Sequence, residues 1–462
     1  MKILNDKDTI IAPLTPSVGG SISVIRISGK LSIPLTAKFF SDKELFNSSG
    51  GKFYYGSFSE NKKNLIDEVL ILVFKSPNSF TGEDVIEINS HANPFIVDKI
   101  IQTYLKSGCR LAEAGEFSKR AFLNDKIDLI QAEAIADLIS SRSELGVQNS
   151  LFQLKGRLSD KLNSIKKRII DITSYLELDL DFTEEDIEIV SSSEVINIIT
   201  TTEQEISALI NSFKHSKLIS KGLDVLITGK PNVGKSSLMN AFLGTSRAIV
   251  SDQPGTTRDI IHEQMLIENI LVRFTDSAGI HLTSNSIEAE GIERAREFYN
   301  QADILLLTLD VSEEFTPEDI NLIKALSGFY KEKTIFLANK CDKPINSQNK
   351  NTIKNLAEKT LYVSAKTEEG LETVRKEIIA KAFQQQSPAK DELLITNQRQ
   401  HDGLVRTKEA LFNARKTLES DAGNEFAALD MRAAIDAITE ITGEITTDEI
   451  LNNLFSHFCT GK

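Results

Sequence analysis

The sequence predicts a multidomain α/β and α protein, in which an N-terminal α+β module is followed by a helical domain with an α/β domain inserted into it. Three observations predict this fold class. The length of 462 residues corresponds to about three domains of ordinary size. The spacing of apolar residues changes along the chain from a strand period to a helix period. A glycine-rich phosphate-binding pattern lies in the middle, where predicted strands and helices alternate.

The first part of the chain alternates short β-branched runs, such as residues 21–27 and 68–74, with turns rich in Gly, Asn and Ser. Farther on the period becomes helical, because Leu158 and Leu162 share one helix face. Alternating strands and helices follow, and helical spacing returns toward the C-terminus. We therefore predict an α+β module at 1–126, a first helical part at 127–221, an α/β domain at 222–383 and a second helical part at 384–462.

The composition is that of a large globular protein, with 40% hydrophobic and 26% charged residues. No apolar run approaches the roughly 20 residues that a membrane span needs, and the N-terminal residues lack the apolar stretch of a secretory signal. The sequence therefore predicts a cytoplasmic protein with no membrane partner. The cysteines Cys109, Cys341 and Cys459 show no paired spacing, so neither a disulfide framework nor a zinc site is indicated.

The pattern Gly-Lys-Pro-Asn-Val-Gly-Lys-Ser at 229–236 follows the apolar run 223–228 and precedes a helical pattern. A buried strand, a glycine-rich turn and a helix N-terminus form a phosphate-binding loop, because backbone N–H groups and the helix dipole both attract an anion. We expect Lys235 to bridge the terminal phosphates and Ser236 to bind Mg2+. The predicted nucleotide-binding residues of this loop are Asn232, Val233, Gly234, Lys235, Ser236 and Ser237.

Three further segments follow predicted strands in the order that a guanine-nucleotide switch requires. Asp276 can reach the Mg2+ shell, and Gly279 offers its amide to the terminal phosphate. Asp342 can accept both N–H groups on the Watson–Crick edge of guanine, whereas adenine presents an acceptor and a donor there, so the predicted nucleotide is GTP. The predicted residues are Asp276, Ser277, Ala278 and Gly279, then Asn339, Lys340 and Asp342, and finally Ser364, Ala365 and Lys366, which close over the base.

The segment between the first two motifs contains Gly-Thr-Thr-Arg-Asp at 255–259, and the Thr257 hydroxyl is predicted to bind Mg2+ only when the third phosphate is present. Ile280 stands where many GTPases have a glutamine that orients the attacking water. Hydrolysis therefore needs another aid, either an arginine or a monovalent cation near the phosphates. Asn232 and the carbonyls of 251–256 are oxygen ligands that suit potassium, whereas Asn232 alone is equally consistent with bracing its own loop.

Motifs of a second kind are distributed from one end of the chain to the other. They are Asp8-Thr9-Ile10, Arg26-Ile27-Ser28-Gly29, Ser79-Phe80-Thr81-Gly82-Glu83-Asp84, Gly115-Glu116-Phe117-Ser118, Arg120-Ala121-Phe122-Leu123-Asn124 and Phe458-Cys459-Thr460-Gly461-Lys462. With the nucleotide motifs, they make the chain resemble the MnmE (TrmE) family of bacterial tRNA modification GTPases. The resemblance implies that the inserted α/β domain is a Ras-like P-loop GTPase domain.

The resemblance implies a GTPase that is activated by potassium-dependent pairing of its nucleotide domains across a homodimer. The family's magnesium ligands fall on Ser236 and Thr257. Its water-positioning catalytic glutamate falls on Glu288, which the residues alone would place as a solvated carboxylate at a helix start. The family's potassium ligands fall on Asn232, Ser251, Gln253 and Thr256, in a nucleotide-binding segment that also includes Asp252, Pro254, Gly255 and Thr257.

The resemblance also implies that the N-terminal module binds a folate one-carbon donor, either 5,10-methylenetetrahydrofolate or a 5-formyl-tetrahydrofolate analogue. The family's contacts fall on Arg26, Glu87 and Lys126, with Lys462 reaching in from the C-terminus. Basic side chains suit the glutamate tail of folate, and a carboxylate suits the N–H edge of its pterin. Glu83 lies on the same segment as Glu87 and is the other acid available for this contact.

The C-terminal tail carries the family's cysteine, Cys459. Beside Lys462 it is a candidate catalytic nucleophile or redox group, because a nearby ammonium favours the thiolate. A small, packed, unreactive thiol is the alternative. Thr460 departs from the family's large apolar residue at its position, which leaves the docking of the tail open.

The activity implied by the resemblance is the addition of a carboxymethylaminomethyl group to C5 of the wobble uridine of certain tRNAs, in a heterotetramer with an MnmG (GidA)-type FAD protein. The net charge of −13 is unusual for a chain that binds tRNA phosphates, so tRNA meets either a local basic face or a basic partner. A regulatory GTPase of the ribosome-assembly type is an alternative, although it leaves Arg26, Lys126 and the tail unexplained. A third alternative is a folate-binding scaffold whose GTPase domain sets the oligomeric state.

Overall fold

A computed structural model of the chain divides into two compact units. Unit 1 comprises Met1–Ala136, Gln153–Thr200 and Arg406–Lys462, and unit 2 comprises Asp137–Phe152 and Thr201–Val405. The structure describes residues 8–16, 20–61, 64–141, 143–181, 191–244, 262–276, 296–346, 348–349, 352–353, 359–383, 393–420, 422–444, 448–456, 458 and 461.

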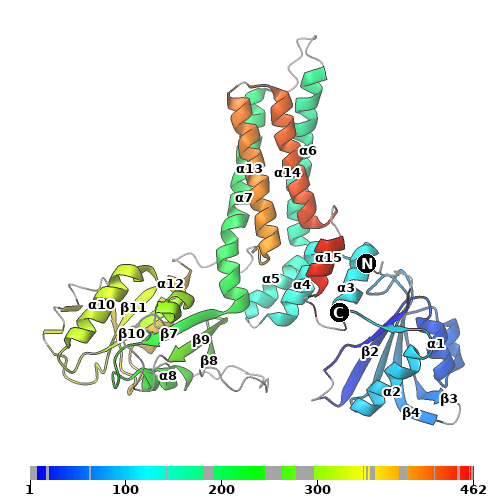
Figure 1. Ribbon diagram of the computed structural model, residues 1–462, viewed down its shortest axis with the longest axis horizontal. Coiled ribbons are helices and arrows are strands. Elements are labelled where there is room, and N and C mark those ends of the chain that lie inside the picture. Colours follow the sequence, from blue (N-terminus) through cyan, green and yellow to red (C-terminus); the bar gives the residue numbers. More distant parts are fainter. Residues whose placement is uncertain are drawn as a thin grey trace. The chain divides into compact units, whose positions relative to one another are not determined.

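A six-stranded sheet forms the N-terminal part of unit 1, with strand order β3-β4-β5-β2-β1-β6. Neighbouring strands are antiparallel except β1 and β6, which are parallel. Helices α1 and α2 pack on one face (Figure 1), where the rings of Phe58 and Tyr104 stack with centroids 6.0 Å apart. The elements are β1 (Ile10–Pro13), β2 (Ile22–Ser28), α1 (Ser32–Phe39), β3 (Lys52–Asn61), β4 (Asn64–Phe74), β5 (Val85–His91), α2 (Pro94–Leu105), β6 (Arg110–Leu111) and α3 (Glu116–Leu123).

Long helices form most of the rest of unit 1. Helix α6 (Arg157–Asp181) packs along α14 (Asn424–Thr442), and the Arg432 guanidinium on α14 donates to Glu177 on α6 at 2.6 Å. Arg406 on α13 (Gln398–Glu419) donates to Glu440 on α14 at 2.5 Å. The helices α4 (Leu129–Ser140) and α15 (Asp448–Ser456) lie mainly in unit 1, whereas α5 (Glu144–Leu154) and α7 (Ser192–Lys221) lie mainly in unit 2. None of the helices in the described part of the chain combines the length and the apolar character that a membrane span needs.

A second six-stranded sheet lies in unit 2, with strand order β12-β11-β10-β7-β9-β8. All neighbouring strands are parallel except the β8–β9 hairpin. The elements are β7 (Leu223–Thr228), α8 (Lys235–Leu243), β8 (His262–Ile267), β9 (Ile270–Asp276), β10 (Ile304–Asp310), α10 (Pro317–Phe329), β11 (Thr334–Asn339), β12 (Thr360–Tyr362) and α12 (Leu371–Ala382). Parallel strands joined through helices place the loops after the strands along one edge of the sheet.

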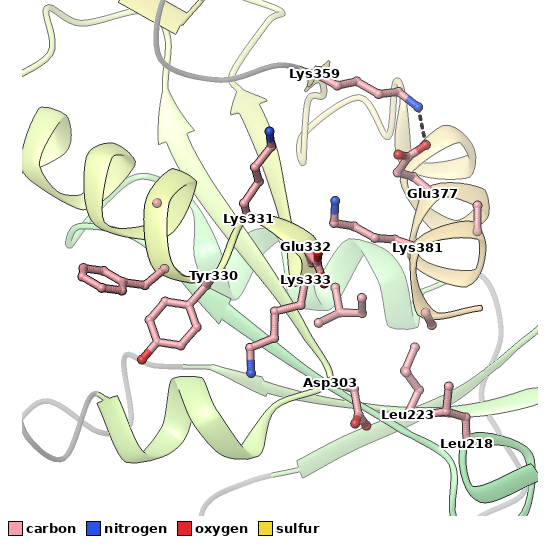
Figure 2. Close-up of a pocket in the computed structure, with 15 residues that line it drawn as sticks. Leu218, Leu223, Asp303, Tyr330, Lys331, Glu332, Lys333, Lys359, Glu377 and Lys381 are labelled. Atoms are coloured by element: carbon pink, nitrogen blue, oxygen red, sulfur yellow. Dashed lines mark hydrogen bonds and ion pairs between the residues drawn. The ribbon is translucent and has the colours of Figure 1, made fainter. Parts of the chain in front are cut away.

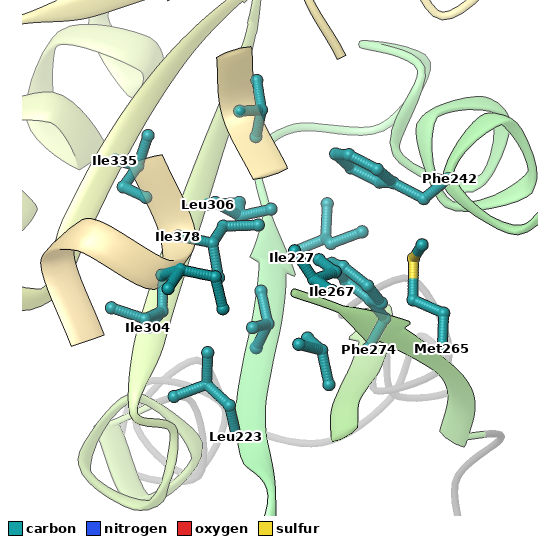
Figure 3. Packing of buried hydrophobic residues seen from close by; sticks show 14 of the residues in the cluster. Leu223, Ile227, Phe242, Met265, Ile267, Phe274, Ile304, Leu306, Ile335 and Ile378 are labelled. Atoms are coloured by element: carbon teal, nitrogen blue, oxygen red, sulfur yellow. The ribbon is translucent and has the colours of Figure 1, made fainter. Parts of the chain in front are cut away.

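Helices cover both faces of this sheet, because alternate side chains of each strand point to opposite sides. On one face α8 and α12 pack against the strands, and the rings of Phe242 and Phe274 stack with centroids 5.0 Å apart (Figure 3). On the other face Leu305 and Leu307 pack with Ile323 of α10. The α+β sheet, the long helices and this α/β sheet confirm the predicted fold class.

Buried polar contacts join α5 and α7 to residues 394–395, in the segment that follows the α/β sheet in the chain. The Asn149 side-chain amide donates to the Leu394 carbonyl at 3.2 Å, and its oxygen accepts from the Leu394 N–H at 3.1 Å. Ser212 accepts from the Ile395 N–H at 3.1 Å, and Ser216 donates to the Ile395 carbonyl. Each partner is at least nine-tenths buried, so these bonds tie residues far apart in the chain.

Candidate nucleotide-binding site

The phosphate-binding pattern forms the turn between β7 and α8. Gly234 precedes the helix with a φ of +96°, and a Cβ at this position would lie 2.4 Å from the Asn339 side chain. Gly229 has a φ of +144°, and a Cβ there would lie 2.4 Å from the Thr308 carbonyl oxygen. Both positions therefore require glycine. The resulting turn directs the N-terminus of α8, with its unpaired N–H groups, toward the edge where the strands end.

Lys235 is the first residue of α8 and is 4% exposed. Its ammonium donates to the Gly229 carbonyl at 2.9 Å and to the Lys230 carbonyl at 2.8 Å. Burial lowers the pKa of Lys235, and the nearby Asp276 carboxylate opposes this shift. The ammonium is thus held inside the turn, where a phosphate group could replace the carbonyl contacts.

Ser236 and Asp276 lie side by side although they come from different elements. The Ser236 hydroxyl on α8 donates to the Asp276 carboxylate at the end of β9, at 2.8 Å. Parallel pairing of β7 with β9 brings them together, since both strands end at the same edge. A hydroxyl and a carboxylate beside a phosphate-binding turn are hard oxygen ligands, which fit magnesium.

The segments after β11 and β12 meet at this edge. The buried Asn339 side chain donates to the Val233 carbonyl at 2.8 Å and accepts from the Ala365 N–H at 3.1 Å. The exposed carboxylate of Asp342 accepts from the Ser364 hydroxyl at 2.7 Å. That hydrogen bond lowers the pKa of Asp342 and keeps the carboxylate ionised. Asn339 therefore joins the phosphate-binding turn to the segment that begins with Ser364, and Asp342 is oriented next to both.

The predicted folate contacts lie at the N-terminal sheet of unit 1. Arg26 on β2 and Glu87 on β5 are directly opposite in the sheet, and the guanidinium donates to Glu87 at 2.7 and 3.0 Å. The guanidinium also lies 4.9 Å from the ring centre of Phe80 and 5.5 Å from that of Phe117. Lys126 donates to the carbonyl of Pro77 at 2.9 Å, in the segment that leads to Phe80.

Glu83, the other acid of this segment, is engaged elsewhere. It accepts from Arg120 at 3.0 and 3.1 Å and from the Ser28 hydroxyl at 2.7 Å. Glu87 is therefore the carboxylate paired with Arg26.

Several predicted residues lie outside the described residues. They are Ser251, Asp252, Gln253, Pro254, Gly255, Thr256, Thr257, Ser277, Ala278, Gly279, Glu288, Cys459 and Lys462. In the tail, the described Phe458 packs on Phe455 with ring centres 5.2 Å apart. Gly461 has a φ of +108° and lies so close to the Pro13 carbonyl that a Cβ would be 2.4 Å from its oxygen. The described part of the tail thus contacts the N-terminal module near β1.

Comparison with known proteins identifies the family. A family model described as the MnmE helical domain matches residues 129–459, and one described as the GTP-binding protein TrmE N-terminus matches residues 9–126. The tRNA modification GTPase MnmE of Alkaliphilus metalliredigens is 37% identical over 460 residues, which cover 98% of this chain and 99% of the relative. This chain belongs to the MnmE family. The MnmE of Aquifex aeolicus is 39% identical, over 99% of this chain and 100% of the relative.

Solved structures similar to the chain include two nucleotide-binding proteins. The G domain of the T. maritima FeoB iron transporter is 27% identical, covers 35% of this chain and 98% of its own, and has a TM-score of 0.27. A variant of Aquifex aeolicus Era bound to GDP.AlF4- is 24% identical, covers 40% of this chain and 66% of its own, and has a TM-score of 0.28. The assignment to the MnmE family rests on the sequence matches alone. The sequence matches confirm the resemblance inferred from the motifs.

Sequence reasoning missed two groups beside the phosphate-binding turn of this MnmE-family chain. Lys230 donates to the Thr316 hydroxyl at 2.6 Å and to Asp319 at 3.1 Å, which ties the turn to the start of α10. Asp310, at the end of β10, lies 2.5 Å from the Lys340 ammonium. The Thr-Pro-Glu-Asp start of α10 is readable as a capping box. The contact of this helix start with Lys230 could not be predicted, because Lys230 lies in a distant part of the sequence.

A cavity of about 1010 Å3 opens at the opposite edge of the same sheet (Figure 2). Residues at or just before the starts of four parallel strands line it, namely Leu223, Ile304, Lys333 and Lys359. Lys359 is paired with Glu377 at 2.5 Å. The phosphate-binding turn follows the other end of β7, so this cavity is separate from the candidate nucleotide site.

Proposed function

We propose that this MnmE-family chain binds and hydrolyses GTP as part of tRNA modification. With an MnmG (GidA)-type FAD partner, it would add a carboxymethylaminomethyl group to C5 of the wobble uridine. The observation that carries the proposal is the convergence of Lys235, Ser236, Asp276 and Asp342 at one sheet edge, joined by Asn339. The sequence identity over nearly the whole chain with relatives named tRNA modification GTPases supports it.

In this proposal each side chain has one task. Lys235 neutralises the terminal phosphates once they displace the two carbonyls that it contacts. Ser236 and Thr257 bind magnesium, which when bound neutralises charge on the phosphate oxygens. Asp342 selects guanine because its ionised carboxylate accepts both N–H groups of the base. Asn339 keeps the base-binding and phosphate-binding segments in register.

Hydrolysis is proposed to depend on potassium held by Asn232, Ser251, Gln253 and Thr256, with Glu288 positioning the attacking water. Ile280 supports this, because its side chain has no group that could orient water. Pairing of two nucleotide domains in a homodimer would depend on this potassium ion and would activate hydrolysis.

The N-terminal module is proposed to bind the folate one-carbon donor. The half-buried Phe80 ring beside the Arg26–Glu87 pair offers a surface on which a flat pterin can stack, and Glu87 offers an acceptor for its N–H edge. Lys126 and Lys462 would bind the glutamate tail, and Cys459 is the proposed nucleophile or redox group of the tail. The TrmE N-terminus match over residues 9–126 supports the assignment of the module.

The domain boundaries are likewise proposals. The match to the MnmE helical domain runs across 129–459 and so includes the α/β sheet, which supports a nucleotide domain at 222–383 inserted between helical parts at 127–221 and 384–462. Such a placement lets a change in the nucleotide domain act on the helices at both of its ends. The chain is proposed to act in the cytoplasm, where its tRNA substrate is found.

The proposal is tested by mass spectrometry of nucleosides from tRNA of cells that lack this chain. The expected result is the loss of the modified wobble uridine and its return when the gene is restored. Unaltered nucleosides would contradict the proposal and favour a regulatory GTPase of the ribosome-assembly type.

A further inference from the structure

Asp310 is a carboxylate next to the nucleotide site that no motif accounts for. It ends β10 beside Asn339 of β11, with its side chain 11% exposed. One carboxylate oxygen lies 2.5 Å from the Lys340 ammonium. The other accepts from the Ser312 N–H at 3.0 Å and from the Ser312 hydroxyl at 2.7 Å. Both oxygens are therefore fixed in direction.

The charge of this carboxylate is maintained by its partners. Burial acts to raise the pKa of Asp310, but the hydrogen bonds from Lys340 and Ser312 outweigh it and hold the pKa below its ordinary value. At neutral pH the group is thus an anion that faces an ammonium.

Lys340 makes a second contact that reaches the phosphate-binding turn. Its ammonium donates to the Asn232 carbonyl at 2.9 Å. The backbone of Lys340 has a φ of +65° and that of Asn232 also has a φ of +65°, a conformation that residues other than glycine rarely adopt. A chain of contacts therefore runs from β10 through Lys340 to a strained residue of the turn.

The physical effect of Asp310 is to restrict Lys340. A free lysine side chain loses rotamer entropy when it is ordered, which has a cost in free energy. An anion that holds the ammonium near the Asn232 carbonyl removes that cost before the nucleotide arrives, and the peptide of Asn232 is held in the orientation that its turn needs. Preorganisation of this kind increases affinity without any contact to the ligand.

We propose that Asp310 is a positioning residue for guanine nucleotides, which acts through Lys340 on the Asn232 carbonyl and so couples the base-binding segment to the phosphate-binding turn. This inference rests on the proposed function, because it presumes that the site binds GDP and GTP.

The test is titration of the full-length chain with a fluorescent GDP analogue. Asp310→Ala should weaken binding about tenfold, the effect of losing one charge-assisted hydrogen bond. Asp310→Asn removes the charge and offers one oxygen for the two sides that the carboxylate serves, so it should also weaken binding, by at least about threefold. Glu377→Ala is the matched control, since it removes the carboxylate partner of Lys359 at the opposite edge of the sheet and should leave GDP binding unchanged.

A double-mutant cycle separates action through Lys340 from a general effect on stability. Lys340→Met should weaken binding at least as much as Asp310→Ala, because Lys340 is itself a predicted nucleotide-binding residue, and the double variant should bind no worse than Lys340→Met alone. Full additivity, or wild-type affinity of either Asp310→Ala or Asp310→Asn, would overturn the inference. If the wild-type chain bound no guanine nucleotide, the proposed function itself would fail instead. Should Asp310→Ala not fold, Asp310→Asn and its cycle with Lys340→Met give the same decision.

Discussion

At the residue scale, the chemistry of the site depends on which hydrogen-bonding groups each side chain offers. Asp342 is exposed, yet the Ser364 hydroxyl orients its carboxylate and lowers its pKa. An ionised carboxylate has only acceptors, and guanine presents two donors on the facing edge. We therefore propose that selection of the base follows from this one oriented side chain.

Asp342→Asn tests this selection. The amide offers one donor and one acceptor, so it faces one guanine N–H with an N–H of its own. We expect GDP affinity to fall at least about a hundredfold. Xanthine carries an oxygen in place of the guanine amino group and should bind the variant better than guanine does. Competition between GDP and xanthosine diphosphate measures the preference, and an unchanged order would contradict the role of Asp342.

Glu288→Ala tests the proposed positioning of water. The variant should bind GDP and GTP as the wild type does, because the residue is not proposed to contact nucleotide, whereas phosphate release should fall at least about a hundredfold. Phosphate release under single-turnover conditions is the measurement. Unchanged turnover would remove Glu288 from the mechanism.

At the element scale, polar side chains on α4 and α5 hold the segment 394–396, which follows the α/β sheet in the chain. Asn149 completes both hydrogen bonds of the Leu394 backbone, and Thr396 donates to Asp137 at 2.7 Å. These contacts join positions separated by 245 and 259 residues, so no local pattern could have predicted them. The strands and the phosphate-binding turn could be predicted, since each is encoded by consecutive residues. The Asp310–Lys340 contact was missed for the same reason as the Asn149 contacts.

Asn149→Ala should destabilise unit 2. The change removes the two buried hydrogen bonds between Asn149 and the Leu394 backbone, which costs about 2 kcal/mol. Faster hydrogen exchange at Leu394 and a lower unfolding midpoint are the expected results. Asn211→Ala, at an exposed position of α7, is the control and should change neither. Equal protection of Leu394 in both variants would show that the contact contributes nothing.

Asp137→Asn should make stability less dependent on pH. Burial raises the pKa of Asp137, and the Thr396 hydroxyl only partly opposes it. The folded state therefore binds the proton more tightly than the unfolded state, so the contribution of Asp137 to stability falls as pH rises from about 3.9, the ordinary value, through the raised pKa. Asparagine keeps the acceptor for Thr396 without charge.

The Asp137→Asn variant should be more stable than the wild type at neutral pH, as measured by thermal unfolding, and the difference in stability should shrink in acid. Asp171→Asn, exposed on α6, should show no such trend.

At the scale of the whole molecule, the chain combines a nucleotide site on one sheet with an Arg–Glu pair and aromatic rings on another. The motifs predicted both sites because each is carried by short, contiguous segments. Their assignment to one family rests on identity across nearly the whole length. Given the formal charge of −13, we propose that tRNA is bound through a local basic face or by a partner protein.

The most direct test of the central claim, that potassium held by oxygens of the phosphate-binding turn and its neighbouring loop assists GTP cleavage, is the hydrolysis rate of the purified chain in KCl and in NaCl of equal ionic strength. We expect a rate at least about tenfold higher in KCl, because a potassium ion that fits the site stabilises charge on the phosphates. Equal rates in the two salts would contradict it.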